Sequence, residues 1–180
     1  MALELKKNKE INLTKSAPAL KVVRIGLAWD EGADLDASAI LLDENNKLVD
    51  GTPVYYGNLS AAGIQHSGDA RDGEAEGDDE SIVINLDEVD PRVKKAIISV
   101  TSYSETDAVT FGSTANPVAR LYDGDKVLIE AKLDEEAAFG TAMEFVELVK
   151  NADGQWIYKN LSETAGQSNN GLSDIVAKYN

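Results

Sequence analysis

Two Asp-Gly dipeptides, each placed between two apolar runs, constrain the possible folds of this chain most strongly. Asp123-Gly124 separates residues 117–122 from 126–133, and Asp153-Gly154 separates 143–150 from 155–159. An Asp-Gly pair readily adopts the positive φ angles that tight hairpin turns require, so each dipeptide predicts two neighbouring antiparallel strands. By periodicity alone the run 143–150 could be helix or strand, and the turn that follows it favours the strand.

The rest of the chain also contains short runs that are typical of strands. The clearest are residues 20–29, 37–42, 54–56, 81–86 and 96–103, the last of which is rich in β-branched side chains. The turn signal at 43–46 and the return of the chain at 47–49 indicate a further hairpin. Weak alternation around Leu3 and Ile11 is typical of short or edge strands.

The C-terminal segment is the one that the sequence clearly predicts to be helical. Leu172, Ile175, Val176 and Tyr179 recur at helical spacing, and Asn170 can cap the first turn. Many short strands, one short helix and no internal repeat predict an all-β chain, namely an antiparallel β-sandwich with a short C-terminal helix. A length of 180 residues fits one domain that covers residues 1–180.

The composition argues against several classes of protein. A net charge of −15 disfavours nucleic acid and anionic membranes as partners, because both bind clustered Lys and Arg. The absence of cysteine excludes a disulfide framework and a zinc–thiolate site. No apolar run approaches the ~18 residues of a membrane span, and the first residues do not resemble a secretory signal. We therefore expect a soluble, cytoplasmic protein without direct membrane insertion.

The acidic stretch 68–80 carries the strongest functional signal. Its thirteen residues contain seven carboxylates and three glycines, opposed by one arginine. Such a segment repels itself unless a cation binds within it, and its many oxygens suit calcium, which takes about six to eight oxygen ligands. A second acidic element at 30–38 could complete the site. We expect a divalent-cation site that binds calcium, and more than one ion; the alternative is a solvated loop.

Other metal and enzyme motifs fit less well. The spacing is not that of an EF-hand, because aligning Gly73 with the loop glycine puts Ala70 and Gly68 at ligand positions. Asp34-Leu35-Asp36 resembles the nucleophile motif of haloacid-dehalogenase-type phosphatases, but that chemistry uses a parallel sheet with intervening helices. One histidine and no cysteine leave no Ser-His-Asp or Cys-His arrangement. We expect a binding protein and not an enzyme, with a metal-dependent phosphatase as the weaker alternative.

Four ordered motifs resemble those of a known family. They are G-L-A-W-D at residues 26–30, D-L-D-A-S at 34–38, H-S-G-D at 66–69 and G-E-A-E-G-D-D-E at 73–80. The chain strongly resembles the TerD family of tellurite-resistance and chemical-stress proteins over essentially its whole length. This resemblance implies a β-sandwich, calcium bound by the acidic loops, and a cytoplasmic stress system with protein partners that include membrane-associated ones.

Carried onto matching positions, the resemblance also implies a set of calcium ligands. The main candidates are Asp34, Asp36, Asp69, Asp78, Asp79 and Glu80. Additional candidates for the metal site are Asp30, Asp72, Gly73, Glu74, Glu76 and Gly77, where the glycines would act as backbone hinges. The chain departs from the family pattern at Ala33, Ala70, Asp72 and Ala75, where Phe, Asn, Thr and Gly are expected. These departures bear on the number and affinity of bound ions.

Several of these residues also have structural interpretations. Asp30 could bind the ion or accept a hydrogen bond from a turn. His66 is expected to be structural or exposed, because calcium prefers oxygen ligands. Four aromatic residues are expected in the core or on a sheet face: Trp29, Tyr55, Tyr56 and Trp156.

Two functions remain from the sequence. The first is a calcium-binding stress-response domain, in which the ion orders the acidic loops and so prepares a surface for a protein partner. The alternative is an adaptor or scaffold of the same stress system that works without metal.

Overall fold

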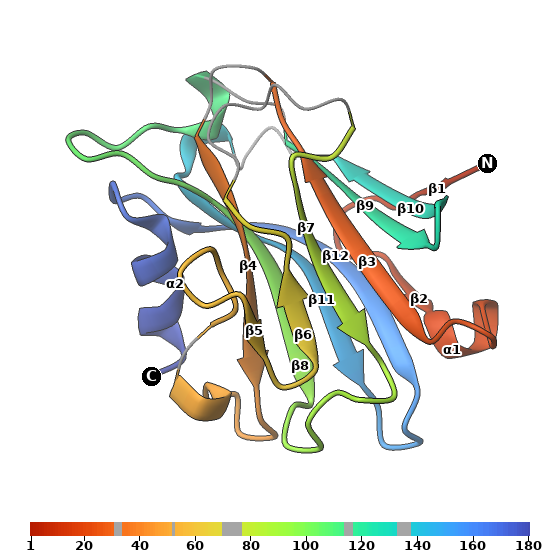
Figure 1. Ribbon diagram of the computed structural model, residues 1–180. Coiled ribbons are helices and arrows are strands. Elements are labelled where there is room, and N and C mark those ends of the chain that lie inside the picture. Colours follow the sequence, from red (N-terminus) through yellow and green to blue (C-terminus); the bar gives the residue numbers. More distant parts are fainter. Residues whose placement is uncertain (31–33, 52, 70–76, 114–116, 133–137) are drawn as a thin grey trace.

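The strands of this protein form two facing sheets, as the computed structural model shows for residues 1–30, 34–51, 53–69, 77–113, 117–132 and 138–180 (Figure 1). The strands of the larger sheet are β1 (Leu3–Glu4), β3 (Val22–Ala28), β5 (Ser60–Ala61), β6 (Ile64–His66), β7 (Glu80–Asn85), β9 (Val118–Asp123) and β10 (Lys126–Lys132). Those of the smaller sheet are β2 (Glu10–Asn12), β4 (Leu35–Leu42), β8 (Lys95–Ser102), β11 (Ala142–Lys150) and β12 (Trp156–Gly166).

The strand order gives an antiparallel sandwich. The seven-stranded sheet runs β1-β10-β9-β3-β7-β6-β5 and the five-stranded sheet runs β2-β12-β11-β8-β4. Of the described strand pairs, β1 with β10 is parallel and the others are antiparallel. The predicted β-sandwich with a short C-terminal helix is therefore confirmed.

Helices are few and short in the described part of the chain. They include α1 (Leu13–Ser16), α2 (Gly171–Lys178) and 3₁₀ turns at Val49–Gly51 and Phe111–Ser113. None of these helices has the length and apolar character needed to cross a membrane. As predicted, Asn170 caps α2, and its side chain accepts a hydrogen bond from the backbone N–H of Ser173.

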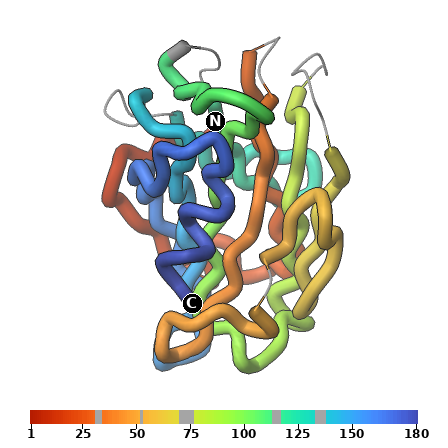
Figure 2. Tube along the Cα trace, turned by 90° about the vertical axis from the view of Figure 1, so that its left-hand side faces the viewer, coloured from red at the N-terminus to blue at the C-terminus, as the bar shows by residue number. Residues whose placement is uncertain are grey.

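The main core lies between the sheets because the strands alternate apolar and polar residues. In β3, Val23, Ile25 and Leu27 are buried, whereas Arg24 between them is partly exposed. A second apolar cluster covers the outer face of the five-stranded sheet, where α2 packs (Figure 2). It contains Ile40, Leu42, Ile97, Ala142, Leu161 and Ile175.

Both Asp-Gly hairpins are confirmed. One joins β9 to β10 and the other joins β11 to β12. Gly124 and Gly154 adopt φ angles of 56° and 74°, the conformation for which glycine is favoured at these turns.

Two predicted elements differ in the structure. The run 54–56 makes only isolated bridges, from Val54 to Ala39 and from Tyr55 to Asn58, because the chain turns back on itself at 55–58. The expected return at 47–49 is one bridge, from Leu48 to Leu42, followed by a 3₁₀ turn.

The edges of both sheets are short or covered. The edge strands β1 and β5 have two residues each, and β2 has three. The fourth edge strand, β4, has eight residues, and Val54 and Leu48 form bridges to it.

Candidate metal centre

The candidate ligands come from strand ends that meet at one end of the sandwich. Figure 1 shows the end of β3 and the beginnings of β4 and β7 together there. Strand β4 begins at Leu35, two residues earlier than the sequence predicts, so that Asp36 belongs to the strand and Asp34 directly precedes it. Asp69 follows β6, and Glu80 is the first residue of β7.

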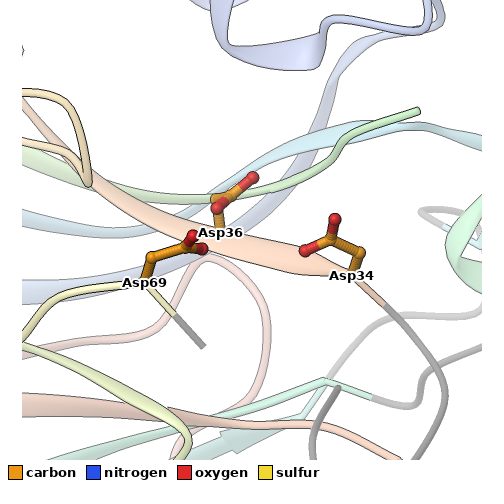
Figure 3. A group of neighbouring side chains, drawn as sticks. All are labelled: Asp34, Asp36 and Asp69. Carbon is orange, nitrogen blue, oxygen red and sulfur yellow. The ribbon is translucent and has the colours of Figure 1, made fainter. Parts of the chain in front are cut away.

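Three of the six main candidates form a cluster. Asp34, Asp36 and Asp69 each offer a carboxylate oxygen, and these oxygens lie within 4.8 Å of one another. Figure 3 shows the side chain of Asp36 between those of Asp34 and Asp69. Asp34 and Asp69 are exposed, whereas Asp36 is only 5% exposed. No described residue donates a hydrogen bond to the Asp36 carboxylate.

This arrangement makes the charged form of Asp36 unfavourable. Burial raises the pKa of Asp36 to about 7, and the negative charges of Glu80, Asp34 and Asp69 act in the same direction. The opposing effect of His66 is smaller. A buried carboxylate that is surrounded by carboxylates is a site that a cation would stabilise.

Glu80 is buried beside the cluster and contacts the backbone of β4. Its Oε2 accepts a hydrogen bond of 2.7 Å from the backbone N–H of Ala37. The His66 ring contacts both of these residues: its Nε2 lies 3.2 Å from Glu80 Oε2 and 3.0 Å from the carbonyl oxygen of Ala37. Nδ1 accepts from the N–H of Gly68 at 2.9 Å, so the proton sits on Nε2. His66 is therefore structural, as expected, and Glu80 links the start of β4 to β7.

Asp78 lies outside the cluster and is bound by two arginines. Its carboxylate is 7% exposed and lies 3.0 Å from Arg24 Nη1 and 2.9 Å from Arg120 Nη1. Gly26 makes room for it, since a Cβ added there would overlap Asp78 Oδ2. Arg24 also stacks 3.6 Å above the ring of Tyr122. Asp78 thus fixes the chain just before β7 to the outer face of the larger sheet.

Asp79 and Asp30 lie near the end of β3. Asp79 Oδ2 accepts a hydrogen bond of 2.9 Å from the N–H of Trp29, and its own N–H donates to the carbonyl oxygen of Leu27. Its Oδ1 is buried without a hydrogen-bond partner among the described residues. Asp30 is exposed and, like Asp79, is not part of the three-carboxylate cluster.

The remaining candidates for the metal site are Gly77, which the structure describes, and four residues that it does not describe. Gly77 has a φ of 102°, a backbone conformation that suits the hinge expected there. The other four lie outside the described residues: Asp72, Gly73, Glu74 and Glu76. All four positions that depart from the family pattern also lie outside the described residues, namely Ala33, Ala70, Asp72 and Ala75.

The cluster opens into a cavity of about 360 Å³, which we call the acidic pocket. Its lining residues are Asp34, Asp36, Tyr56, Asp69, Tyr103, Ser104 and Glu105. The sequence did not identify Tyr103, Ser104 and Glu105 as part of the site. These residues follow β8, and only long-range pairing brings β8 beside β4, with Leu35 opposite Ser102. Tyr56 was expected in the core or on a sheet face, but it is 44% exposed and lines this pocket.

The residues present fit a hard divalent cation. Three carboxylates supply six oxygen atoms from three separate chain positions, and one of the carboxylates is buried without a hydrogen-bond donor in the described part of the chain. Carboxylate oxygens are the ligands that calcium and magnesium prefer, and calcium tolerates irregular coordination better. The oxygen donors therefore suit calcium, which would offset two of the three negative charges of the cluster.

These features define a class of protein, a β-sandwich with acidic residues gathered at one end. The model of the TerD domain matches residues 1–179, and the chain belongs to this family. It is 36% identical to tellurium resistance protein TerD of Serratia marcescens over 99% of this chain and 97% of that protein. It is 30% identical to general stress protein 16U of Bacillus subtilis, again over 99% and 97%.

A solved structure shares the fold. The crystal structure of a homologue of telluride resistance protein (TerD) from Streptomyces coelicolor A3(2) matches with a TM-score of 0.71 at 23% identity. The match covers 83% of this chain and 93% of that one. The chain is thus a member of a family whose named proteins include tellurium-resistance and stress-response proteins.

Proposed function

We propose that this chain is a calcium-binding stress-response protein whose cluster of Asp34, Asp36 and Asp69 holds a calcium ion. The observation that carries the proposal is Asp36, which is 5% exposed and faces two further carboxylates. A dication would replace repulsion among these groups by attraction. The names of the relatives, which refer to tellurium resistance and stress response, support the biological setting.

Binding of the ion would join separate parts of the chain. Asp34 directly precedes β4 and Asp36 lies in it, whereas Asp69 follows β6 in the other sheet. A shared ion would therefore hold the two sheets together at this end and order the surface around the acidic pocket, which we propose as the surface for a protein partner. The buried Oδ1 of Asp79, which has no hydrogen-bond partner among the described residues, supports a second ion in the same region.

We further propose a cytoplasmic binding role, with protein partners of the stress-response system and no catalysis. The motif that resembles a phosphatase nucleophile lies on β4, which pairs antiparallel with β8, and not on the parallel sheet that such chemistry uses. The single histidine is buried and contacts Glu80 and Ala37. Both observations favour binding over catalysis.

Calorimetric titration of chelator-treated protein with calcium tests the proposal. We expect saturable binding that persists in millimolar magnesium and is lost when Asp36→Asn and Asp69→Asn are combined. The matched control combines Asp125→Asn and Asp153→Asn, which removes the same charge from two exposed turn residues and should leave binding unchanged. Absence of saturable binding to the unchanged protein, or equal loss in both double variants, would contradict a calcium site at this cluster.

A metal-independent adaptor is the second candidate function. The observation that favours it is that Asp78 and Glu80 already have protein partners, the first in Arg24 and Arg120 and the second in Ala37 and His66. Part of the acidic segment is thus held in place by the protein itself. Full stress tolerance in cells that carry the Asp36→Asn and Asp69→Asn variant would favour the adaptor.

A further inference from the structure

A second cavity, of about 470 Å³, lies beside the acidic pocket, and we call it the helix pocket. One side is formed by α2, through Gly171, Leu172 and Val176. The other is formed by the segment that contains Tyr55 and Tyr56 and by the end of β8. Its volume falls in the range of about 300–1,000 Å³ that is typical of pockets for small molecules.

The two cavities share Asp36. Its side chain lines both the acidic pocket and the helix pocket, together with Tyr56 and Tyr103. Asp36 is 5% exposed and receives no hydrogen bond from a described residue. No lysine or arginine occurs among the described residues that line the helix pocket. A ligand in this pocket would therefore meet a buried carboxylate that no lysine or arginine of the described lining neutralises.

Aromatic and aliphatic groups form the walls around this carboxylate. The rings of Tyr55 and Tyr56 contact edge to face, with centroids 5.2 Å apart. Tyr56 and Tyr103 are 44% and 40% exposed, so large parts of their surfaces are accessible. Tyrosine rings attract cations through the negative face of the π-system, and this attraction grows when water is excluded. Leu172 and Val176 add an apolar surface for an uncharged part of the ligand.

The local charge decides among ligand classes. The cluster of Asp34, Asp36 and Asp69 carries up to three negative charges beside the helix pocket, and one calcium ion would leave a negative charge there. An anionic ligand would be repelled with or without calcium, and a neutral ligand would leave Asp36 without a partner. A ligand with an ammonium group would both pair with the carboxylate and contact the tyrosine rings.

We propose that the helix pocket binds a small organic amine in its protonated form. Its ammonium group pairs with the Asp36 carboxylate, and its apolar body packs between the tyrosines and the Leu172–Val176 side of α2. The assignment goes beyond calcium binding and does not require it.

The test is an NMR titration of ¹⁵N-labelled, chelator-treated protein with 2-phenylethylamine, and with 2-phenylethanol as a neutral probe of the same shape. We expect the amine to bind at least about tenfold more tightly than the alcohol, which corresponds to about 1.4 kcal/mol. The shifts should include the amides of Gly171, Leu172 and Val176. Equal affinity for both probes, or shifts that leave α2 unchanged, would overturn the proposal.

Variants separate this site from general attraction to an acidic protein. Asp36→Asn should remove the preference for the amine over the alcohol, whereas Asp125→Asn, which removes the same charge from an exposed turn, should keep it. Tyr103→Ala should weaken amine binding, and Phe139→Ala, at a residue that is 80% exposed and does not line the pocket, should not. Retention of the full preference in both Asp36→Asn and Tyr103→Ala would count against the site even if one variant were poorly folded.

Repeating the amine titration in calcium separates the amine site from the proposed calcium function. Because calcium and the amine would share Asp36, saturating calcium should weaken binding of the amine by the same factor as the amine weakens binding of calcium. The titration without calcium decides the amine site by itself. If calcium does not bind at all, the amine result stands, and only the proposed calcium function fails.

Discussion

Two carboxylates that look equivalent in the sequence have different surroundings in the structure. Asp36 is buried beside other carboxylates, whereas Asp78 is held between Arg24 and Arg120. The arginines are 54 and 42 residues away from Asp78 in the sequence, so only the pairing of β3 with β7 and β9 brings them together. Local sequence therefore identifies both aspartates as candidate ligands and cannot separate their roles.

Asp78→Asn should lower stability more than it affects calcium binding. Loss of one charge from a largely buried pair with two arginines is expected to lower the free energy of unfolding by about 1–3 kcal/mol. The number of bound calcium ions should stay the same. Chemical denaturation and calorimetry measure the two effects. The matched control is Asp87→Asn, which removes an exposed partner of Lys21 at 3.4 Å and should change stability little.

A double-mutant cycle can check the cause. Gly26→Ala places a methyl group where the Asp78 carboxylate lies and should also destabilise the protein. If the clash with Asp78 is the reason, Gly26→Ala should cost much less in an Asp78→Ala background. Additive losses would show that Gly26 is needed for some other contact.

The buried position of Asp36 also predicts a pH dependence. Its pKa in the folded protein is raised from 3.8 to about 7, so the folded state holds this proton more tightly than the unfolded chain does. In chelator, the free energy of unfolding should therefore fall as the pH rises from about 4 to about 7, by at most about 4 kcal/mol from this group. Denaturation at pH 5 and pH 8 measures this. Asp36→Asn should flatten the dependence, and an unchanged slope would contradict the role of Asp36.

At the scale of elements, the sequence predicts the strands, turns and helix whose patterns lie within a short stretch of the chain. The Asp-Gly turns and strand alternation identify β9 to β12, and helical spacing with Asn170 identifies α2. The order of strands is not local: β3 lies between β9 and β7, and β1 pairs in parallel with β10 across more than a hundred residues. Irregular pairing is also missed, as in the isolated bridges of Val54 and Tyr55.

The cap of α2 can be tested by two substitutions at one position. Asn170→Ala removes the acceptor for the Ser173 N–H and should lower the free energy of unfolding by about 1 kcal/mol. Asn170→Ser retains a capping oxygen and should change it by only a few tenths, about 0.3 kcal/mol. Equal losses in the two variants, measured by urea denaturation, would mean that the Asn170 side chain acts in another way.

At the scale of the molecule, the candidate site lies where the two sheets contact each other. The hydrogen bond from Ala37 to Glu80 links β4 in one sheet to β7 in the other, and the cluster adds residues from both sides. The motifs predicted which segments contribute, because residues 34–38 and 66–69 are recognisable in the sequence. They could not predict that Tyr103, which directly follows β8, lines the same pocket.

Calcium should therefore change the protection of separate segments together. We expect slower amide hydrogen exchange at residues 34–37 and 66–69 on calcium addition, and a melting temperature that rises with calcium concentration. The Asp125→Asn and Asp153→Asn double variant serves as the control and should respond like the unchanged protein. Calcium binding without any change in exchange would contradict the proposed ordering of this surface.

The short outer strands have a consequence for how this protein meets other chains. Three of the four sheet edges expose strands of two or three residues, and the fourth is partly covered by Val54 and Leu48. Such edges offer little unpaired backbone for another chain to extend the sheet, which is a common route to aggregation. The protein should therefore stay monodisperse when concentrated, and recognition of a partner should depend on side chains and bound ions more than on strand addition.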